Sequence, residues 1–196
     1  MSLVSNVKVY DLEESIIASG YPMRTVAEMR PVEEKDITRC INLSNACNHG
    51  NGAHGQYLTG IRVAFDLRFS NKAWVEAERY RFFEFVSSQS TMHRVAKFDI
   101  KSQCNKYVTN NTIKEVERLK AIYLAHPSAE NYLILLYNLP SGFELTARMT
   151  TNYRCLKNIY IQRKNHRLPE WKEFCEWMET LPMFKELCLG GDIDES

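Results

Sequence analysis

Residues 61–69 alternate between inward apolar and outward side chains over the segment I-R-V-A-F-D-L-R-F, and this pattern constrains the fold more than any other. A period of two is typical of a strand that buries one face and exposes the other. Shorter patterns predict strands over residues 6–10 and 143–150. A sheet with an apolar face needs a second layer to cover it.

Amphipathic segments between and after these strands supply that layer. The predicted helices cover residues 13–19, 32–48, 111–126, 129–137 and 152–166, with a last helix beginning at Pro169. Ser70 is the expected N-cap of another helix that continues to about residue 86. We therefore predict an α+β fold, with a mixed or antiparallel sheet flanked by helices. One domain should span residues 1–189, followed by a flexible acidic tail at 190–196.

The composition excludes several functional classes. A net charge of +1 gives no field that favours nucleic acid or an anionic membrane. No apolar run reaches the ~18 residues that a membrane-spanning helix needs. Six cysteines are scattered without a C-x-x-C pair, so we expect reduced thiols, no metal site and a cytoplasmic protein.

One arginine lies on the apolar side of the helix predicted at residues 152–166. At about 100° per residue, Arg163 falls within the stripe formed by Leu156 and Ile159. A guanidinium stays charged in proteins, so burying it requires a nearby anion. Either a protein carboxylate such as Glu144 or Glu170 pairs with it, or an anionic or strongly polar ligand does.

The opposite face of this helix is polar. Asn152 is the expected N-cap, and Arg154, Asn158 and Gln162 follow at intervals of four residues. Amides and a guanidinium in a row can bind the edge of a heteroaromatic ring or a phosphate. The alternative is an ordinary solvated face.

Three further segments carry weaker signals. The glycine-rich residues 49–55 would let backbone amides approach a phosphate, although a flexible turn is the preferred interpretation. Arg79 and Arg81 are two residues apart and do not share a helix face. Residues 87–107 are irregular, and short strands or turns are expected there. They place small hydroxyls beside Arg94, a combination that suits a phosphate or carboxylate.

Four polar residues resemble, in order and spacing, the C-terminal half of flavin-dependent thymidylate synthases. They are Asn152, Arg154, Asn158 and Arg163. Leu139-Pro140 also stands at the family's distance from the asparagine, and His54 stands where the family has a histidine before its long strand.

The resemblance implies an α+β homotetramer whose sites lie between subunits. It also implies FAD as cofactor, and transfer of a methylene from methylenetetrahydrofolate to dUMP with NADPH as reductant. The residues carried over for the flavin are Asn152, Arg154, Asn158, Arg79, Arg81 and His54. Those carried over for the nucleotide are Ser90, Arg94 and Arg163, of which Arg94 and Arg163 would be catalytic.

The chain departs from the family in its signature motif. Arg79-Tyr80-Arg81 replaces Arg-His-Arg, and Ser90 follows one residue late. In a second register, anchored on Arg94, residues 82–84 replace the motif and bring in a carboxylate. Leu136 stands where the family has a nucleotide-binding arginine. Two functions follow: a thymidylate synthase-like enzyme, or a non-catalytic flavin- or nucleotide-binding protein with the same fold. Degenerate short members would fit a phage setting.

Overall fold

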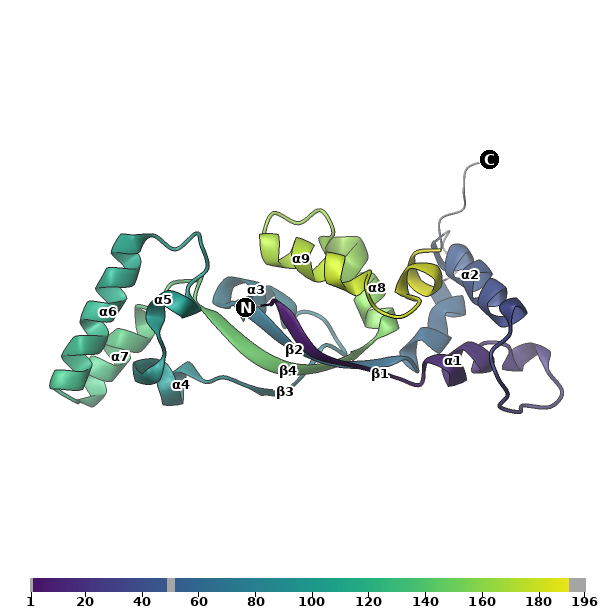
Figure 1. Ribbon diagram of the computed structural model, residues 1–196, viewed down its shortest axis with the longest axis horizontal. Coiled ribbons are helices and arrows are strands. Elements are labelled where there is room, and N and C mark those ends of the chain that lie inside the picture. The colour runs from purple at the N-terminus through teal and green to yellow at the C-terminus, as the bar shows by residue number, and fades with distance from the viewer. Residues whose placement is uncertain (1, 49–51, 191–196) are drawn as a thin grey trace.

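The computed structural model describes residues 2–48 and 52–190 and has a four-stranded antiparallel sheet along its middle (Figure 1). In spatial order the strands are β1 (Val4–Tyr10), β2 (Arg62–Ser70), β4 (Glu144–Asn152) and β3 (Glu84–Ser88). β2 and β4 form its centre, in a register that pairs Arg62 with Asn152. The predicted α+β class is confirmed.

The alternation in β2 produces the two faces of the sheet. Val63, Phe65, Leu67 and Phe69 are buried, and the residues between them lie on the other face. Two helices, α8 (Tyr153–Arg163) and α9 (Pro169–Met178), lie over the buried face (Figure 1), and a π-helix (Lys185–Leu189) follows them. Phe65 and Phe69 each pack against Phe174 of α9, with ring centroids 5.7 Å apart. Aromatic contacts therefore hold this layer on the sheet.

Local signals fixed the starts of several helices as predicted. Pro169 occupies the first position of α9, and the apolar side chains of Trp171, Phe174, Cys175 and Met178 in this helix are buried. The Ser70 hydroxyl caps α3 (Asn71–Ala77) by accepting a hydrogen bond of 3.2 Å from the amide of Ala73. The Ser70 hydroxyl thus pairs an amide of the first helical turn that would otherwise be unpaired, and Pro169 has no amide N–H to pair.

A second cluster of buried apolar residues lies at the end of the molecule far from α1 and α2 (Figure 1). It is built by α4 (Thr91–Arg94), a 3₁₀ helix (Val95–Lys97), α5 (Ile100–Gln103), α6 (Asn110–Ala125) and α7 (Ala129–Tyr137). Its core holds Val95, Ile100, Val116, Leu119, Leu135 and Phe143. The helices predicted at 111–126 and 129–137 are confirmed as α6 and α7, whereas the single-domain organisation stays a prediction.

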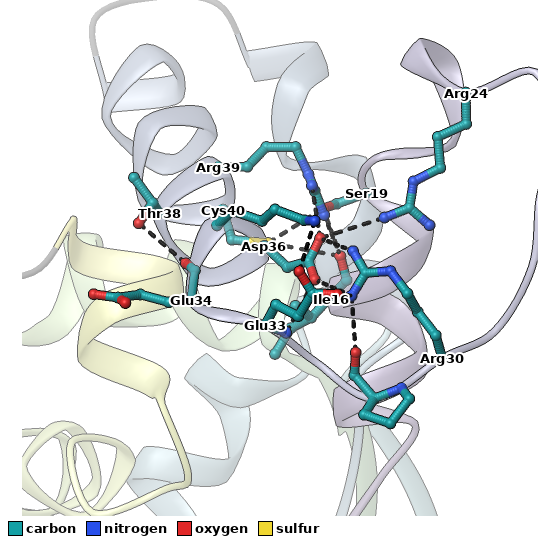
Figure 2. Close-up of polar contacts among 12 residues, drawn as sticks. Ile16, Ser19, Arg24, Arg30, Glu33, Glu34, Asp36, Thr38, Arg39 and Cys40 are labelled. Atoms are coloured by element: carbon teal, nitrogen blue, oxygen red, sulfur yellow. Dashed lines mark hydrogen bonds and ion pairs between the residues drawn. The ribbon is translucent and has the colours of Figure 1, made fainter.

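The other end holds α1 (Leu12–Ala18), a 3₁₀ helix (Tyr21–Met23) and α2 (Glu34–Asn48). Asp36 of α2 is fully buried among three arginines, which form the Asp36 cluster with it (Figure 2). The Asp36 carboxylate lies 2.7 Å from Arg30, 2.8 Å from Arg39 and 3.3 Å from Arg24. Burial alone would raise the pKa of Asp36. Hydrogen bonds from Arg30, the Glu33 amide and Arg39 outweigh it and hold the pKa well below its usual range.

Two predictions about the middle of the chain are wrong. The helix that Ser70 caps ends at Ala77 instead of continuing to residue 86, and Glu84–Ser88 form the edge strand β3. Phe82 has a φ of 68°, a left-handed conformation that a helix cannot continue through. Residues 87–107 contain short helices where strands or turns were expected.

The glycine-rich segment was predicted as a flexible turn over residues 49–55. Its first part, 49–51, lies outside the described residues, and Gly52–Thr59 form a 3₁₀ helix. The acidic tail lies outside them too, apart from Gly190, which is buried and follows the π-helix with a φ of 99°. Within residues 2–48 and 52–190, no helix has both the length and the apolar character needed to cross a bilayer.

Candidate functional site

The site begins where β4 runs directly into α8. Asn152 is the last residue of the strand and the N-cap of the helix. Its Oδ1 accepts a hydrogen bond of 2.9 Å from the amide of Cys155, as predicted for an N-cap asparagine. The first turns of the helix then carry Arg154 and Asn158 into the solvent-facing space beside the strand end.

Strand pairing brings residues from two other strands to the same place. Arg62, the first residue of β2, lies opposite Asn152. Glu84, the first residue of β3, lies opposite Thr150. Residues 150 and 152 share one face of the sheet because side chains alternate along a strand. The strand register therefore places the ends of three strands side by side on one face of the sheet.

These groups surround an open cavity of about 700 Å³, which we call the strand-end cleft. It is lined by Gln56, Thr59, Arg62, Arg81, Phe82, Glu84, Thr150, Thr151, Asn152, Arg154, Cys155 and Asn158. Its size lies within the range of about 300–1,000 Å³ typical of sites for small ligands and cofactors.

The turn between α3 and β3 forms one wall and is fixed to the opposite side of the cleft. The carbonyl oxygen of Phe82 accepts a hydrogen bond of 2.7 Å from the Thr151 hydroxyl. The carbonyl oxygen of Arg81 accepts one of 3.4 Å from the Cys155 thiol. The Arg81 guanidinium also lies 5.0 Å from the centre of the Phe82 ring. Arg81 is therefore held at the cleft although its side chain is exposed.

The cleft is rich in positive charge. Arg62, Arg81 and Arg154 line it, whereas Glu84 is the one carboxylate among its described lining residues. Arg154 donates a hydrogen bond to the Gln56 side chain. Among the residues that the structure describes, neither Arg62 nor Arg81 has an ion-pair partner. Arginines beside the N-terminus of an eleven-residue helix make a favourable environment for an anion.

Of the residues that the sequence assigned to a flavin, four meet in the strand-end cleft. They are Asn152, Arg154, Asn158 and Arg81. Arg79 is exposed in the turn after α3 and is not among the described lining residues. His54 is exposed and lines a different hollow, of about 740 Å³, on the outer face of α2.

The residues assigned to the nucleotide are not gathered at this cleft within one chain. Ser90 and Arg94 belong to the far end of β3, where the Gln89 amide donates to the carbonyl oxygen of Thr146. Thr146 precedes Asn152 by six residues on β4, which corresponds to about 20 Å along a strand. Ser90 and Arg94 therefore lie well away from the α8 end of the same chain.

Arg163 is buried as predicted, and a protein carboxylate neutralises it. Its Nη1 lies 2.7 Å from Oε2 of Glu76 on α3, an acid that differs from the two examples named above. Its Nε donates a hydrogen bond of 2.6 Å to the Tyr80 hydroxyl, which in turn donates to Gln162. Its guanidinium carbon lies 4.7 Å from the centre of the Trp171 ring. Arg163 thus joins α8 to α3 and α9.

Glu76 is equipped to stay ionised in this position. Burial, the largest contribution, would raise its pKa, but Lys72, His166 and Arg163 together lower it below its usual value. Lys72 lies 3.0 Å from Oε1, and the Trp171 indole donates a hydrogen bond of 3.2 Å to Oε2. In this structure Arg163 is therefore one member of an ion pair inside the fold.

Sequence reasoning missed several lining residues. Arg62 and Glu84 begin strands that lie side by side with β4 only in the folded sheet, and Gln56 comes from the 3₁₀ helix before β2. No short-range spacing connects them to Asn152. Only the strand register could have revealed Arg62 and Glu84.

Comparison with known proteins gives a match at the level of the fold. No protein-family model matches the chain, and no curated protein sequence matches it. The flavin-dependent thymidylate synthase ThyX from Helicobacter pylori, solved with FAD and dUMP, superimposes with a TM-score of 0.75 at 16% identity. The match covers 96% of this chain and 98% of that one.

A second group of similar structures is represented by the UMP/dUMP methylase PolB from Streptomyces cacaoi, bound with 5-Br dUMP. It superimposes with a TM-score of 0.63 at 15% identity, over 96% of this chain and 93% of that one. The chain therefore has the fold of flavin-dependent thymidylate synthases, as the spacing of its polar residues implied.

Proposed function

We propose that this chain binds FAD in the strand-end cleft and methylates a pyrimidine nucleotide, in the manner of a thymidylate synthase that converts dUMP to dTMP. One observation carries the proposal. Four of the six residues assigned to a flavin by the resemblance, Asn152, Arg154, Asn158 and Arg81, line one cleft of suitable size. The similar ThyX structures contain FAD and dUMP, and the similar PolB structures contain brominated nucleotides.

The chemical types of the residues in the cleft suit the groups of a flavin dinucleotide. A diphosphate is matched by guanidinium groups and by the N-terminal amides of α8. The amides of Asn158 and Gln56 can donate to and accept from the polar edge of a ring. Phe82 offers an aromatic surface at the wall. The bound flavin would supply the hydride that the reductive step requires.

The chain's own residues would bind and orient rather than form covalent bonds. Cys155 lines the cleft, but burial raises the pKa of its thiol, so it is protonated at neutral pH and is not a nucleophile. Arg81 and Arg154 would neutralise phosphate charge. Asn152 would hold the start of α8 against the strand end, and so keep Arg154 and Asn158 in position.

The complete reaction also requires NADPH, methylenetetrahydrofolate and a nucleotide site. We propose that the chain forms a homo-oligomer, a tetramer by resemblance, and that the nucleotide site is completed between its subunits. Ser90 and Arg94 lie far from the cleft in their own subunit, so a second subunit would have to supply them. For Arg163 to contact a nucleotide, its ion pair with Glu76 would have to open.

That ion pair favours the second function, a non-catalytic flavin- or nucleotide-binding protein. An arginine neutralised by Glu76 is not available to stabilise negative charge on a uracil ring. Leu136 offers no substitute at the position where the family reads the nucleotide. This alternative retains the cleft and loses the reaction.

Two measurements separate these functions. Purified protein should take up FAD, with a change in the flavin absorption spectrum, and a protein that binds no FAD at tens of micromolar would exclude the enzyme. A protein that binds neither FAD nor dUMP nor UMP would exclude both functions. With FAD, NADPH and methylenetetrahydrofolate present, the enzyme should release tritium from [5-³H]dUMP. Binding of FAD without tritium release from dUMP or UMP would leave the non-catalytic function.

A further inference from the structure

The strand-end cleft has two chemically different ends. At one end, the N-terminus of α8 is joined by Arg154 and by Arg62, which lies opposite the N-cap Asn152. At the other end, Glu84 lies opposite Thr150 on β4. Thr150 and Asn152 are two positions apart on β4, which corresponds to about 7 Å along the strand.

Glu84 is not neutralised by the protein. It is the first residue of the edge strand β3, and its side chain is exposed. Among the residues that the structure describes, it has no ion-pair partner, although three arginines line the same cleft. A carboxylate that could have paired with an arginine remains directed to a ligand or to solvent.

We propose that Glu84 fixes the direction in which a flavin or nucleotide lies in the cleft. The phosphate lies at the α8 end, and ribityl or ribose hydroxyls or ring N–H groups lie at the Glu84 end. An ionised carboxylate only accepts hydrogen bonds, so it pairs with these donors and repels a phosphate. This inference rests on the proposed function, because it concerns a ligand of the same cleft.

Coulomb's law gives the expected size of the effect. Two unit charges about 7–10 Å apart in a solvent-exposed site repel one another enough to change affinity by a factor of about three to ten. Screening by salt reduces this factor, because the Debye length at physiological ionic strength is about 8 Å. Low-salt measurements therefore show it best.

Riboflavin and FMN provide a direct test because they differ only in one phosphate. The measured quantity is the ratio of their affinities, obtained from flavin fluorescence anisotropy at low salt. Glu84→Gln should raise the preference for FMN over riboflavin about three- to tenfold. Arg62→Gln, at the other end, should lower the same preference by a similar factor.

Three further variants make the test specific. Glu84→Asp keeps the charge and should keep the wild-type ratio. Glu84→Ala also loses the hydrogen-bond acceptor and should weaken riboflavin binding at least threefold. Glu117→Gln removes the same charge from an exposed position on α6, outside the cleft, and should change neither affinity. Thermal melting of each variant verifies that it is folded.

The outcomes are distinguishable. If wild-type protein binds flavins but Glu84→Gln leaves the ratio unchanged, the inference is overturned and the proposed function stands. If Glu84→Gln and Glu117→Gln raise FMN binding equally, the effect is one of net charge and the inference is again overturned. If wild-type protein binds neither flavin, the inference and the proposed function fail together.

Discussion

The chain contains two groups of three arginines with opposite environments. Arg24, Arg30 and Arg39 surround the fully buried Asp36, which gives each of them an ionic contact (Figure 2). The arginines of the strand-end cleft, in contrast, face a cavity of about 700 Å³ whose one described carboxylate is exposed. The fold neutralises the charges of the first group around one carboxylate, whereas Arg62 and Arg81 of the second group have no ion-pair partner among the described residues.

Arg163 belongs to the first kind although the sequence suggested the second. Its side chain is only 10% exposed, and its partner Glu76 is 16% exposed. The comparison shows that burial of an arginine indicates an internal partner at least as strongly as a ligand. We expect exposed arginines at the rim of a cavity to be the better indicator of binding.

The largest effect is expected at the Asp36 cluster. Asp36→Asn leaves three arginines without their buried counter-charge, and should lower the free energy of unfolding by roughly 3–5 kcal/mol, measured by urea denaturation. Glu33→Gln is a matched control on the exposed side of the same cluster and should change stability little. If the two variants were equally stable, the Asp36 cluster would not be a structural one.

The same cluster predicts a pH dependence. The pKa of Asp36 is lower in the folded than in the unfolded chain, so the unfolded state binds the proton more readily. The stabilisation is therefore complete at neutral pH and declines as the pH falls below about 4, the ordinary value of an aspartate. Asp36→Asn should show a flatter loss of stability over this acidic range than wild type.

A smaller loss of stability is expected at Arg163. Arg163→Ala removes the partner of a mostly buried carboxylate, and should lower the free energy of unfolding by roughly 2–4 kcal/mol. The double variant Arg163→Met with Glu76→Leu removes both charges and should recover part of that loss. A stable Arg163→Ala variant with weakened nucleotide binding would contradict the comparison and return Arg163 to the ligand site.

At the strand-end cleft, binding should respond and stability should not. Arg81→Gln should weaken FAD binding about tenfold, the value of one hydrogen bond to a charged group. Because the Arg81 side chain is exposed, the melting temperature of the Arg81→Gln variant should match that of the wild type. Arg79→Gln, two residues away and outside the cleft, is the control. Equal weakening in both variants would point to a general charge effect.

The smallest effect is expected at Asn152, which both caps α8 and lines the strand-end cleft. Asn152→Ala should lose about 1 kcal/mol because the N-cap of α8 is removed, whereas Asn152→Ser retains a capping oxygen and should lose less than about 0.5 kcal/mol. Both variants lack the amide and should weaken FAD binding alike. Urea denaturation and flavin titration of the pair separate the two roles. Equal stability of the two variants would exclude the capping role.

The sequence predicted those parts of the fold that depend on local signals. The alternation of residues 61–69 gave β2, and Ser70, Asn152 and Pro169 marked helix starts because capping involves only neighbouring residues. The strand β3 was missed because all five of its residues are exposed, so burial imposed no alternating pattern on them.

The residues of the candidate site also fall into those that local spacing predicts and those that only the folded sheet brings in. Asn152, Arg154 and Asn158 were found because one helix sets their spacing. Arg62 and Glu84 were not found because they reach the cleft through strand pairing between distant segments. The partner of Arg163 could not be identified because Glu76 is 87 positions away in the chain.

The dual position of Asn152, as strand end and helix cap, limits what its presence can say about activity. A descendant that no longer bound any cofactor would still need a capping oxygen at this position to begin α8 at the right residue. Selection for folding alone would therefore preserve a good capping residue, such as asparagine or serine, at position 152. The exposed Asn158, which the structure shows in no such structural hydrogen bond among the described residues, would be free to drift once binding was lost. In a set of related chains, the fate of Asn158 is the more informative record of whether the site is still used.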